Sequence, residues 1–126
     1  MTKEEFETII SQSLEAFPKR FKEKMKNVAV TLQAEPDDFQ KQQSGYSNGE
    51  YLLGLYEGVP QTQRYHYDKA VPDKITLFQN NIEKIANFDS QAIKQLVNET
   101  LWHEIGHHFG MNETEVRNFI NHKFKH

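Results

Sequence analysis

The sequence contains no cysteine among its 126 residues. A disulfide framework and a thiolate metal site are therefore both excluded, and any metal ion must be held by histidine and carboxylate side chains. Long apolar runs are also missing. No stretch approaches the roughly 18 residues of a membrane-spanning helix, and the acidic start "MTKEEFETII" does not have the form of a secretory signal. From these absences we expect a cytoplasmic protein without a membrane partner.

The sequence also has no excess of positive charge. Fifteen Lys and Arg stand against eighteen Asp and Glu, which gives a net charge of −3. The densest basic stretches, "PKRFKEKMK" and "HKFKH", are interrupted by acidic or aromatic residues, so they indicate solvated helix faces. We therefore expect no nucleic-acid partner. The length fits one domain over residues 1–126.

Hydrophobic periodicity predicts two helices followed by strands in the first part of the chain. Residues 2–17 have helical spacing and begin with Thr2 and Glu5 in the arrangement of a capping box, and a short basic helix is expected over 18–25. Alternating apolar residues predict three strands, in "NVAVTLQ" (27–33), "YLLGLYEG" (51–58) and "KITLFQ" (74–79). Gly54 in the second strand favours a bulge or close packing.

The segments between and after these strands complete the prediction. Residues 35–50 are rich in Pro, Asp, Gln, Ser and Gly and predict a long loop, and a second loop is expected over 59–73. A long helix should begin at Asp89 or Ser90 and run to about Phe109, with Gly110 ending it and a short helix over 113–124 following. The expected fold is α+β, with a small mixed sheet of about three strands packed against the long helix and the N-terminal helix.

The long helix carries the motif "LWHEIGHHFGMNETEV" over residues 101–116. His103 and His107 are four residues apart, about 40° of rotation and one turn on a helix, so both imidazoles can reach one ion. Glu104 lies about 60° around the helix from His107, close enough to face the ion without occupying a ligand position. This pattern is typical of the H-E-x-x-H helix of zinc peptidases.

Catalytic zinc usually takes a third protein ligand and a water molecule. The motif continues to Gly110 and then to Glu113, and a left-handed conformation at the glycine can turn the chain back toward the two histidines. Glu113 is therefore the first candidate for the third ligand, and Glu115 is the alternative. Glu99 is either a hydrogen-bond acceptor for the His103 ring or a solvated helix glutamate.

Other aromatic residues have two competing interpretations. His108 either has a packing or hydrogen-bonding role or contacts the metal ion. Trp102 belongs either to the core, which its size favours, or to a substrate-stacking surface. We expect no catalytic role for His66, His122 or His126.

On these residues the chain resembles the small bacterial zincin-like metallopeptidases that are often called mini-zincins. The stretches that resemble successive blocks of that family are "NVAVTLQAEP", "LLGLYEGVPQTQR", "VPDKITLFQNNIE" and "LWHEIGHHFGMNETEV". The resemblance implies a zincin-like domain, zinc ligands at His103, His107 and the acid at 113, and Glu104 as the catalytic carboxylate. Family members typically have aspartate where this sequence has Glu113. The family lacks a Met-turn, and no methionine follows Met111 here.

The first functional hypothesis is a zinc-dependent peptidase. The ion would activate a water molecule, and Glu104 would take the proton of that water and pass it to the leaving amine. The substrate would be a peptide or an unfolded protein, bound along a free sheet edge. The only candidates for a group that stabilises the oxyanion lie in the predicted loops, and the spacing of none of them favours this role: Tyr46, Tyr65, Tyr67 and His66.

The alternative hypothesis is a zincin-fold module that binds metal or peptide and is catalytically weak or inactive. The glutamate at position 113 and the small size of the chain favour it. The sequence leaves the oligomeric state open, with a homodimer among the options. It also leaves the metal open, because a site with two histidines and a carboxylate accepts several divalent ions, of which zinc is the default for this motif.

Overall fold

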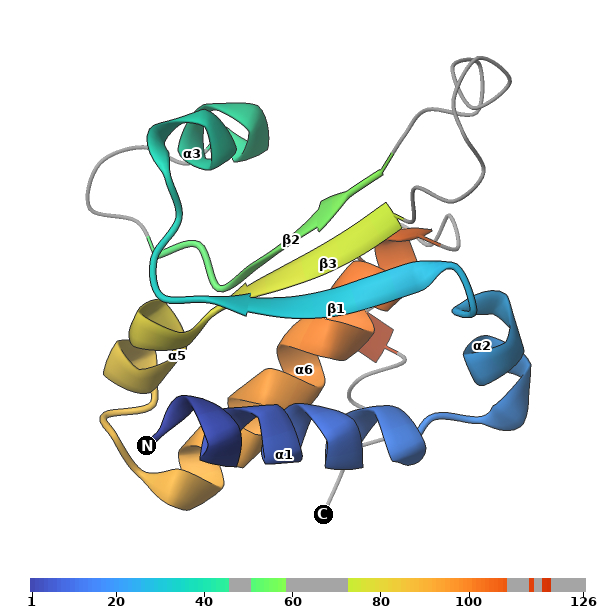
Figure 1. Ribbon diagram of the computed structural model, residues 1–126, viewed down its shortest axis with the longest axis horizontal. Coiled ribbons are helices and arrows are strands. Elements are labelled where there is room, and N and C mark those ends of the chain that lie inside the picture. Colours follow the sequence, from blue (N-terminus) through green and yellow to red (C-terminus); the bar gives the residue numbers. More distant parts are fainter. Residues whose placement is uncertain (46–50, 59–72, 109–113, 115–116, 119–126) are drawn as a thin grey trace.

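The computed structural model describes residues 1–45, 51–58, 73–108, 114, 117 and 118. The described strands β1 (Val28–Gln33), β2 (Gly54–Glu57) and β3 (Asp73–Phe78) form one sheet in the order β1, β3, β2. β1 runs parallel to β3 and β2 runs antiparallel to it, so the sheet is mixed. The helices α1 (Lys3–Glu15) and α6 (Ser90–His108) lie on one face of the sheet, and α3 (Asp38–Ser44) lies on the other (Figure 1). The fold is α+β, as predicted.

Helix α1 begins where its capping residues predict. Thr2 accepts a hydrogen bond from the Glu5 main-chain N–H, and the Glu5 carboxylate accepts one from the Thr2 N–H, at 3.1 and 2.9 Å. Hydrogen bonds with Thr2 lower the pKa of Glu5, and the bond to the Thr2 main chain contributes more than the bond to its side chain. The predicted basic helix is also confirmed, as α2 (Lys19–Lys24).

The core lies between the sheet and the two helices α1 and α6. Ile75 and Leu77 alternate toward it on β3, and their partners on β1 are Val30 and Leu32. Each fully buried Ile, Leu, Val or Phe side chain stabilises the fold by about 1.5–3 kcal/mol. The largest apolar side chains that are fully buried are Phe6, Ile75, Leu77, Phe78, Ile82, Ile93, Val97, Leu101 and Ile105. Seven of these nine, at positions 75, 77, 78, 93, 97, 101 and 105, lie in the predicted third strand or the predicted long helix, so the periodicity identified much of the core.

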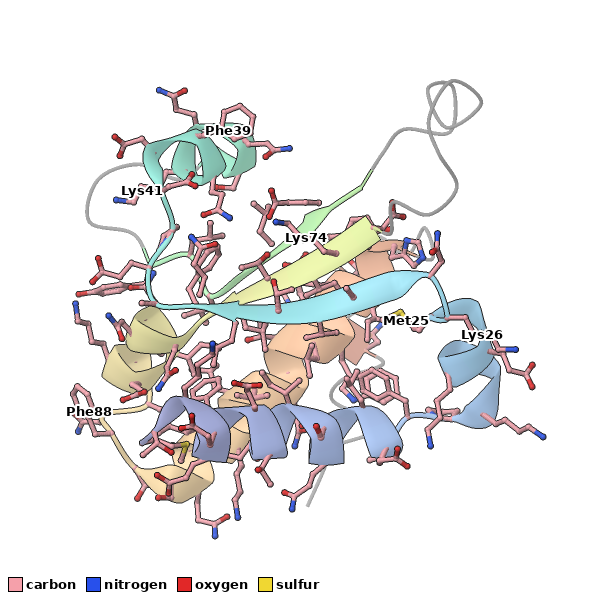
Figure 2. The ribbon with its side chains drawn as sticks, in the orientation of Figure 1. Met25, Lys26, Phe39, Lys41, Lys74 and Phe88 are labelled. Atoms are coloured by element: carbon pink, nitrogen blue, oxygen red, sulfur yellow. The ribbon has the colours of Figure 1, made fainter. Side chains whose placement is uncertain are left out.

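The opposite face of the sheet carries a hydrogen-bonded polar group. The Glu57 carboxylate accepts from the Thr76 hydroxyl at 3.2 Å and from the Gln40 amide of α3 at 3.3 Å. Gln40 is buried and is also bonded to Gln33 of β1. Figure 2 shows Lys74 on the same side of the sheet as α3. These bonds hold α3 on the sheet.

The prediction of a loop over 35–50 is wrong at residues 38–44, which form α3. Asp37 caps this helix by accepting from the Gln40 N–H at 2.7 Å, and the Gln40 side chain accepts from the Asp37 N–H at 2.9 Å. Gly45 ends the helix in the left-handed conformation, with φ of 77°. The residues that suggested a loop are therefore the capping residues of a short helix.

The other predicted elements differ from the structure mainly at their ends. β2 begins at Gly54, so residues 51–53 are outside the strand, although the Leu53 carbonyl still accepts from the Phe78 N–H at 3.0 Å. Helix α5 (Gln79–Ile85) follows β3 directly and was not predicted. The connection from α5 to α6 passes through Asn87 and Phe88, whose φ values are +56° and +59°.

The predicted long helix is confirmed as α6, which the structure describes as far as His108. The Asp89 carboxylate accepts from the Ala92 N–H at 2.9 Å and is the cap at its start. Gly110 and most of the helix expected over 113–124 lie outside the described residues. Within that range the structure describes Thr114, Arg117 and Asn118, and these three residues are helical. In the described part of the chain, the helices are too short or too polar to span a bilayer.

Candidate active site

The H-E-x-x-H motif occupies the last turns of α6 that the structure describes. One side of this helix is fixed in the core by Ile93, Val97, Leu101 and Ile105. Trp102 is also buried and packs edge-on against Phe17, with ring centroids 4.2 Å apart, which confirms the core interpretation of this residue. A hydrogen bond between Ser13 of α1 and Asn98 of α6 adds a polar contact between the two helices. The helix that carries the motif is therefore held against both α1 and the sheet.

The predicted metal ligands are only partly described. His103 lies on α6 and is half-buried, and the backbone of His107 continues the same helix one turn later. The His107 side chain, Glu113 and Glu115 lie outside the described residues. No three His, Asp or Glu side chains come together as a metal site within the part of the chain that the structure describes. The third ligand therefore stays a prediction.

The predicted donor set of two histidines and one carboxylate has the chemistry that zinc requires. Because α6 is helical from Ser90 to His108, His103 and His107 are one turn apart on neighbouring positions of its surface. Two imidazole nitrogens and one carboxylate oxygen are a common set of ligands for catalytic zinc. His103 is half-buried, so part of its side chain is accessible to solvent.

Glu104 is held by β2, which is a terminal strand among the described strands of the sheet. One oxygen of its carboxylate, Oε2, accepts a hydrogen bond from the main-chain N–H of Tyr56 on β2 at 3.1 Å. The side chain is half-buried, and its neighbour in sequence, His103, is a predicted ligand. This contact places the carboxylate of the predicted general base against strand β2.

Tyr56 makes two further contacts near the motif. Its ring stacks on His108, with the centroids 4.7 Å apart and an angle of 24° between the planes. Its hydroxyl donates a hydrogen bond to the carboxylate of Asp73, which is 4% exposed. The packing role predicted for His108 is thus present in the structure. Glu99 accepts a hydrogen bond from the Gln95 amide at 2.8 Å, one turn earlier on the same helix.

Strand β2 and helix α6 approach closely because residue 54 is glycine. A Cβ at Gly54 would lie 2.7 Å from Cγ2 of Thr100 and 3.1 Å from Cδ2 of Leu77. Thr100, Glu104 and His108 follow one another at four-residue intervals, so they form one row on the helix, and each contacts β2. The predicted close packing at Gly54 is confirmed, and it brings the strand within hydrogen-bond distance of Glu104.

Tyr56 and Asp73, which contact each other near the motif, were not among the residues that the sequence predicted for the site. The tyrosines and the histidine proposed as oxyanion donors, residues 46, 65, 66 and 67, lie outside the described residues. Tyr56 was overlooked because it lies within a predicted strand. The available signal was Gly54, since a residue two positions after a close-packed glycine lies on the same face of the strand.

A sequence profile of the zincin-like metallopeptidase family matches residues 25–121. The chain belongs to this family. The match includes the three described strands and the described part of α6, so the family resemblance that the motifs suggested is confirmed. Membership in the zincin-like family indicates a metallopeptidase, for which zinc is the usual ion.

A solved structure supports the same fold. The zincin-like chain is similar to a conserved hypothetical protein from Thermo thermophilus, with 25% sequence identity over 86% of this chain and 94% of that chain. The TM-score between the two structures is 0.58, so the two chains share the same overall fold. No curated protein matches the sequence.

Proposed function

We propose that this zincin-like chain is a zinc-dependent peptidase, with His103, His107 and Glu113 as ligands and Glu104 as general base. The observation that carries the proposal is the position of Glu104. Its carboxylate is on the H-E-x-x-H helix, next in sequence to His103, and lies against the edge of the sheet. A base at this position can serve a water molecule on one side and an extended peptide on the other.

The residues of the chain would divide the reaction between them. Zinc, when bound, lowers the pKa of a water molecule toward about 7 and polarises the scissile carbonyl. Glu104 accepts a proton from the water molecule while the water oxygen forms a bond to the carbonyl carbon. Glu104 then gives this proton to the amine nitrogen as the C–N bond breaks. His103 and His107 hold the ion through ring nitrogens, and Glu113 through a carboxylate oxygen.

The proposed substrate is an extended peptide or an unfolded protein segment. β2 is the terminal strand of the described sheet, and it is the strand that contacts Glu104. A peptide that adds to such an edge is bound by main-chain hydrogen bonds, here to outward groups of β2 other than the Tyr56 N–H that Glu104 holds, with side chains directed alternately to the two faces. This mode favours unfolded segments over folded domains because it requires an extended backbone.

A second candidate function is a binding module that holds a metal ion or a peptide without efficient turnover. The observation in its favour is Glu113, which stands where members of the family typically have aspartate. The extra methylene group changes the reach of the predicted third ligand. A zinc-binding assay on protein without a histidine tag separates the two versions of this candidate, since a chain that takes up no zinc has only a peptide-binding role.

The proposed function is tested with a peptide library. Zinc-loaded protein and the Glu104→Ala variant are incubated with the library, and new N-termini are identified by mass spectrometry. We expect cleavage by the wild-type protein and a loss of about 10²–10⁴-fold in rate for the variant, the usual contribution of a general base. Equal cleavage by both proteins, or none by either, would overturn the proposal.

A further inference from the structure

The structure assigns a positioning role to Tyr56: its main-chain N–H fixes the carboxylate of Glu104, and its ring is fixed in turn by His108 and Asp73. The catalytic consequence rests on the proposed function, but the positioning itself is a property of the metal-free chain. Three observations support this role: the direction of the Tyr56 N–H in the strand, the contacts of the Tyr56 ring, and the close packing around that ring.

The direction of the Tyr56 N–H follows from the strand pairing. The Leu53 carbonyl accepts from the Phe78 N–H of β3, and main-chain groups alternate in direction along a strand. The groups of Leu55 and Glu57 therefore point to β3, and those of Gly54 and Tyr56 point away from it. In the described sheet β2 is a terminal strand, so the Tyr56 N–H would ordinarily face solvent. Here it donates to Glu104 at 3.1 Å.

The side chain of Tyr56 extends the contact along the helix. Tyr56 is paired with Ile75, so its ring lies on the face of the sheet that packs against α6. There it stacks on His108, one turn beyond Glu104, at 4.7 Å. One residue of β2 thus contacts two successive turns of the H-E-x-x-H helix, one through its main chain and one through its ring.

The ring has little freedom to move from this position. Its hydroxyl donates to the buried carboxylate of Asp73 on β3. A Cβ at Gly58 would lie 2.8 Å from Cε1 of the Tyr56 ring and 3.2 Å from the Asp73 carboxylate. Glycine at position 58 therefore lets the chain pass directly beside the Tyr56 and Asp73 pair. The ring is enclosed on the sheet side by Asp73 and on the helix side by His108.

This arrangement means that the strand, as well as the helix, determines where the Glu104 carboxylate lies. A glutamate side chain on a helix surface samples several rotamers, and a hydrogen bond to a fixed donor selects among them. A general base must lie within hydrogen-bond reach of the proton that it removes. Tyr56 therefore acts through Glu104 and is a positioning residue, not a catalytic one.

The test is hydrogen–deuterium exchange of the Tyr56 amide, measured by NMR on the metal-free protein. We expect the Tyr56 amide to exchange at least about tenfold faster in Glu104→Ala than in the wild-type chain, because the edge N–H loses its acceptor. Glu104→Gln keeps a carbonyl oxygen at the same reach and should retain most of the protection. The Phe78 amide, bonded to Leu53 between β3 and β2, is the internal control and should not change in either variant.

A second pair of variants tests the role of the ring. Tyr56→Phe keeps the stacking surface and Tyr56→Leu removes it, so the residue-56 amide should exchange faster in Tyr56→Leu than in Tyr56→Phe. Equal exchange of the Tyr56 amide in the wild-type chain and Glu104→Ala overturns the positioning role, whether or not the protein cleaves peptides. Equal exchange in the two ring variants overturns the part assigned to the ring. A third outcome is that the Tyr56 amide loses its protection in Glu104→Ala while the wild-type protein cleaves no peptide. This outcome supports the positioning role and overturns the proposed function.

Discussion

Gly54 of β2 and Thr100 of α6 are packed without space for a side chain between them, since a Cβ on the glycine would lie 2.7 Å from Cγ2 of the threonine. We predict that Gly54→Ala destabilises the protein by about 1–3 kcal/mol, the usual cost of overpacking. Thr100→Ser removes the crowded methyl group and keeps the hydroxyl that donates to the Leu96 carbonyl at 2.7 Å. The double variant should therefore recover part of the lost stability in chemical denaturation, and strictly additive effects would contradict this contact.

A substitution at Phe88 is predicted to stabilise the protein. It is 67% exposed and has a φ of +59°, a conformation that costs a residue other than glycine about 1–2 kcal/mol. We expect Phe88→Gly to raise the free energy of unfolding by about 0.5–1 kcal/mol, after the greater flexibility of glycine in the unfolded chain is included.

Phe39→Gly is the matched control for this change. Phe39 is 69% exposed, but it lies in the first turn of α3, and Figure 2 shows it on a different part of the surface from Phe88. Glycine within a helix costs about 1 kcal/mol, so this variant should be less stable than the wild-type chain. If both variants are destabilised equally, the conformation at Phe88 is not a source of strain.

Glu104 should matter for the reaction and not for the affinity of the ion. We predict that Glu104→Gln binds zinc within about twofold of the wild-type chain, because the residue is not a ligand, and hydrolyses peptides about 10²–10⁴-fold more slowly. Zinc content is measured by atomic emission, and rates are compared at equal occupancy. A variant that loses zinc along with activity would identify Glu104 as a ligand instead.

The third ligand can be identified by comparing two neighbouring glutamates. We predict that Glu113→Gln lowers zinc affinity by about tenfold or more, or at least 1.4 kcal/mol, and that Glu115→Gln leaves it unchanged. Competition with a chromogenic chelator measures both affinities. The reverse order of effects would identify Glu115 as the ligand. The variant Glu113→Asp is a further check on position 113, since it introduces the residue that is typical of the family there.

The sequence predicted those parts of the fold that depend on local pattern. The apolar spacing of α6 and the alternation of Ile75 and Leu77 identified elements whose buried faces are regular. Helix α3 was missed because only three residues, Asp37, Gln40 and Gly45, define its ends, and because its contact with the sheet depends on the distant Glu57. A short helix of this kind is stabilised by tertiary contacts and leaves little periodicity in the sequence.

The candidate site shows the same division between local and distant information. His103, Glu104 and His107 are visible in the sequence because a helix brings residues four apart together. The contact between Glu104 and Tyr56 joins residues that are 48 positions apart, and it depends on which strand forms the sheet edge and in which register. Neither property follows from spacing along the chain, so Tyr56 was found only in the structure.

The proposed function requires that His103 and His107 bind one zinc ion together. The most direct measurement is the ¹⁵N NMR signal of the histidine rings in tag-free protein, recorded while zinc is added. We predict that the ring nitrogens of His103 and His107 shift together and stop changing at one equivalent of zinc, with assignments confirmed by His103→Ala and His107→Ala. Unchanged signals from both rings in excess zinc would contradict the account.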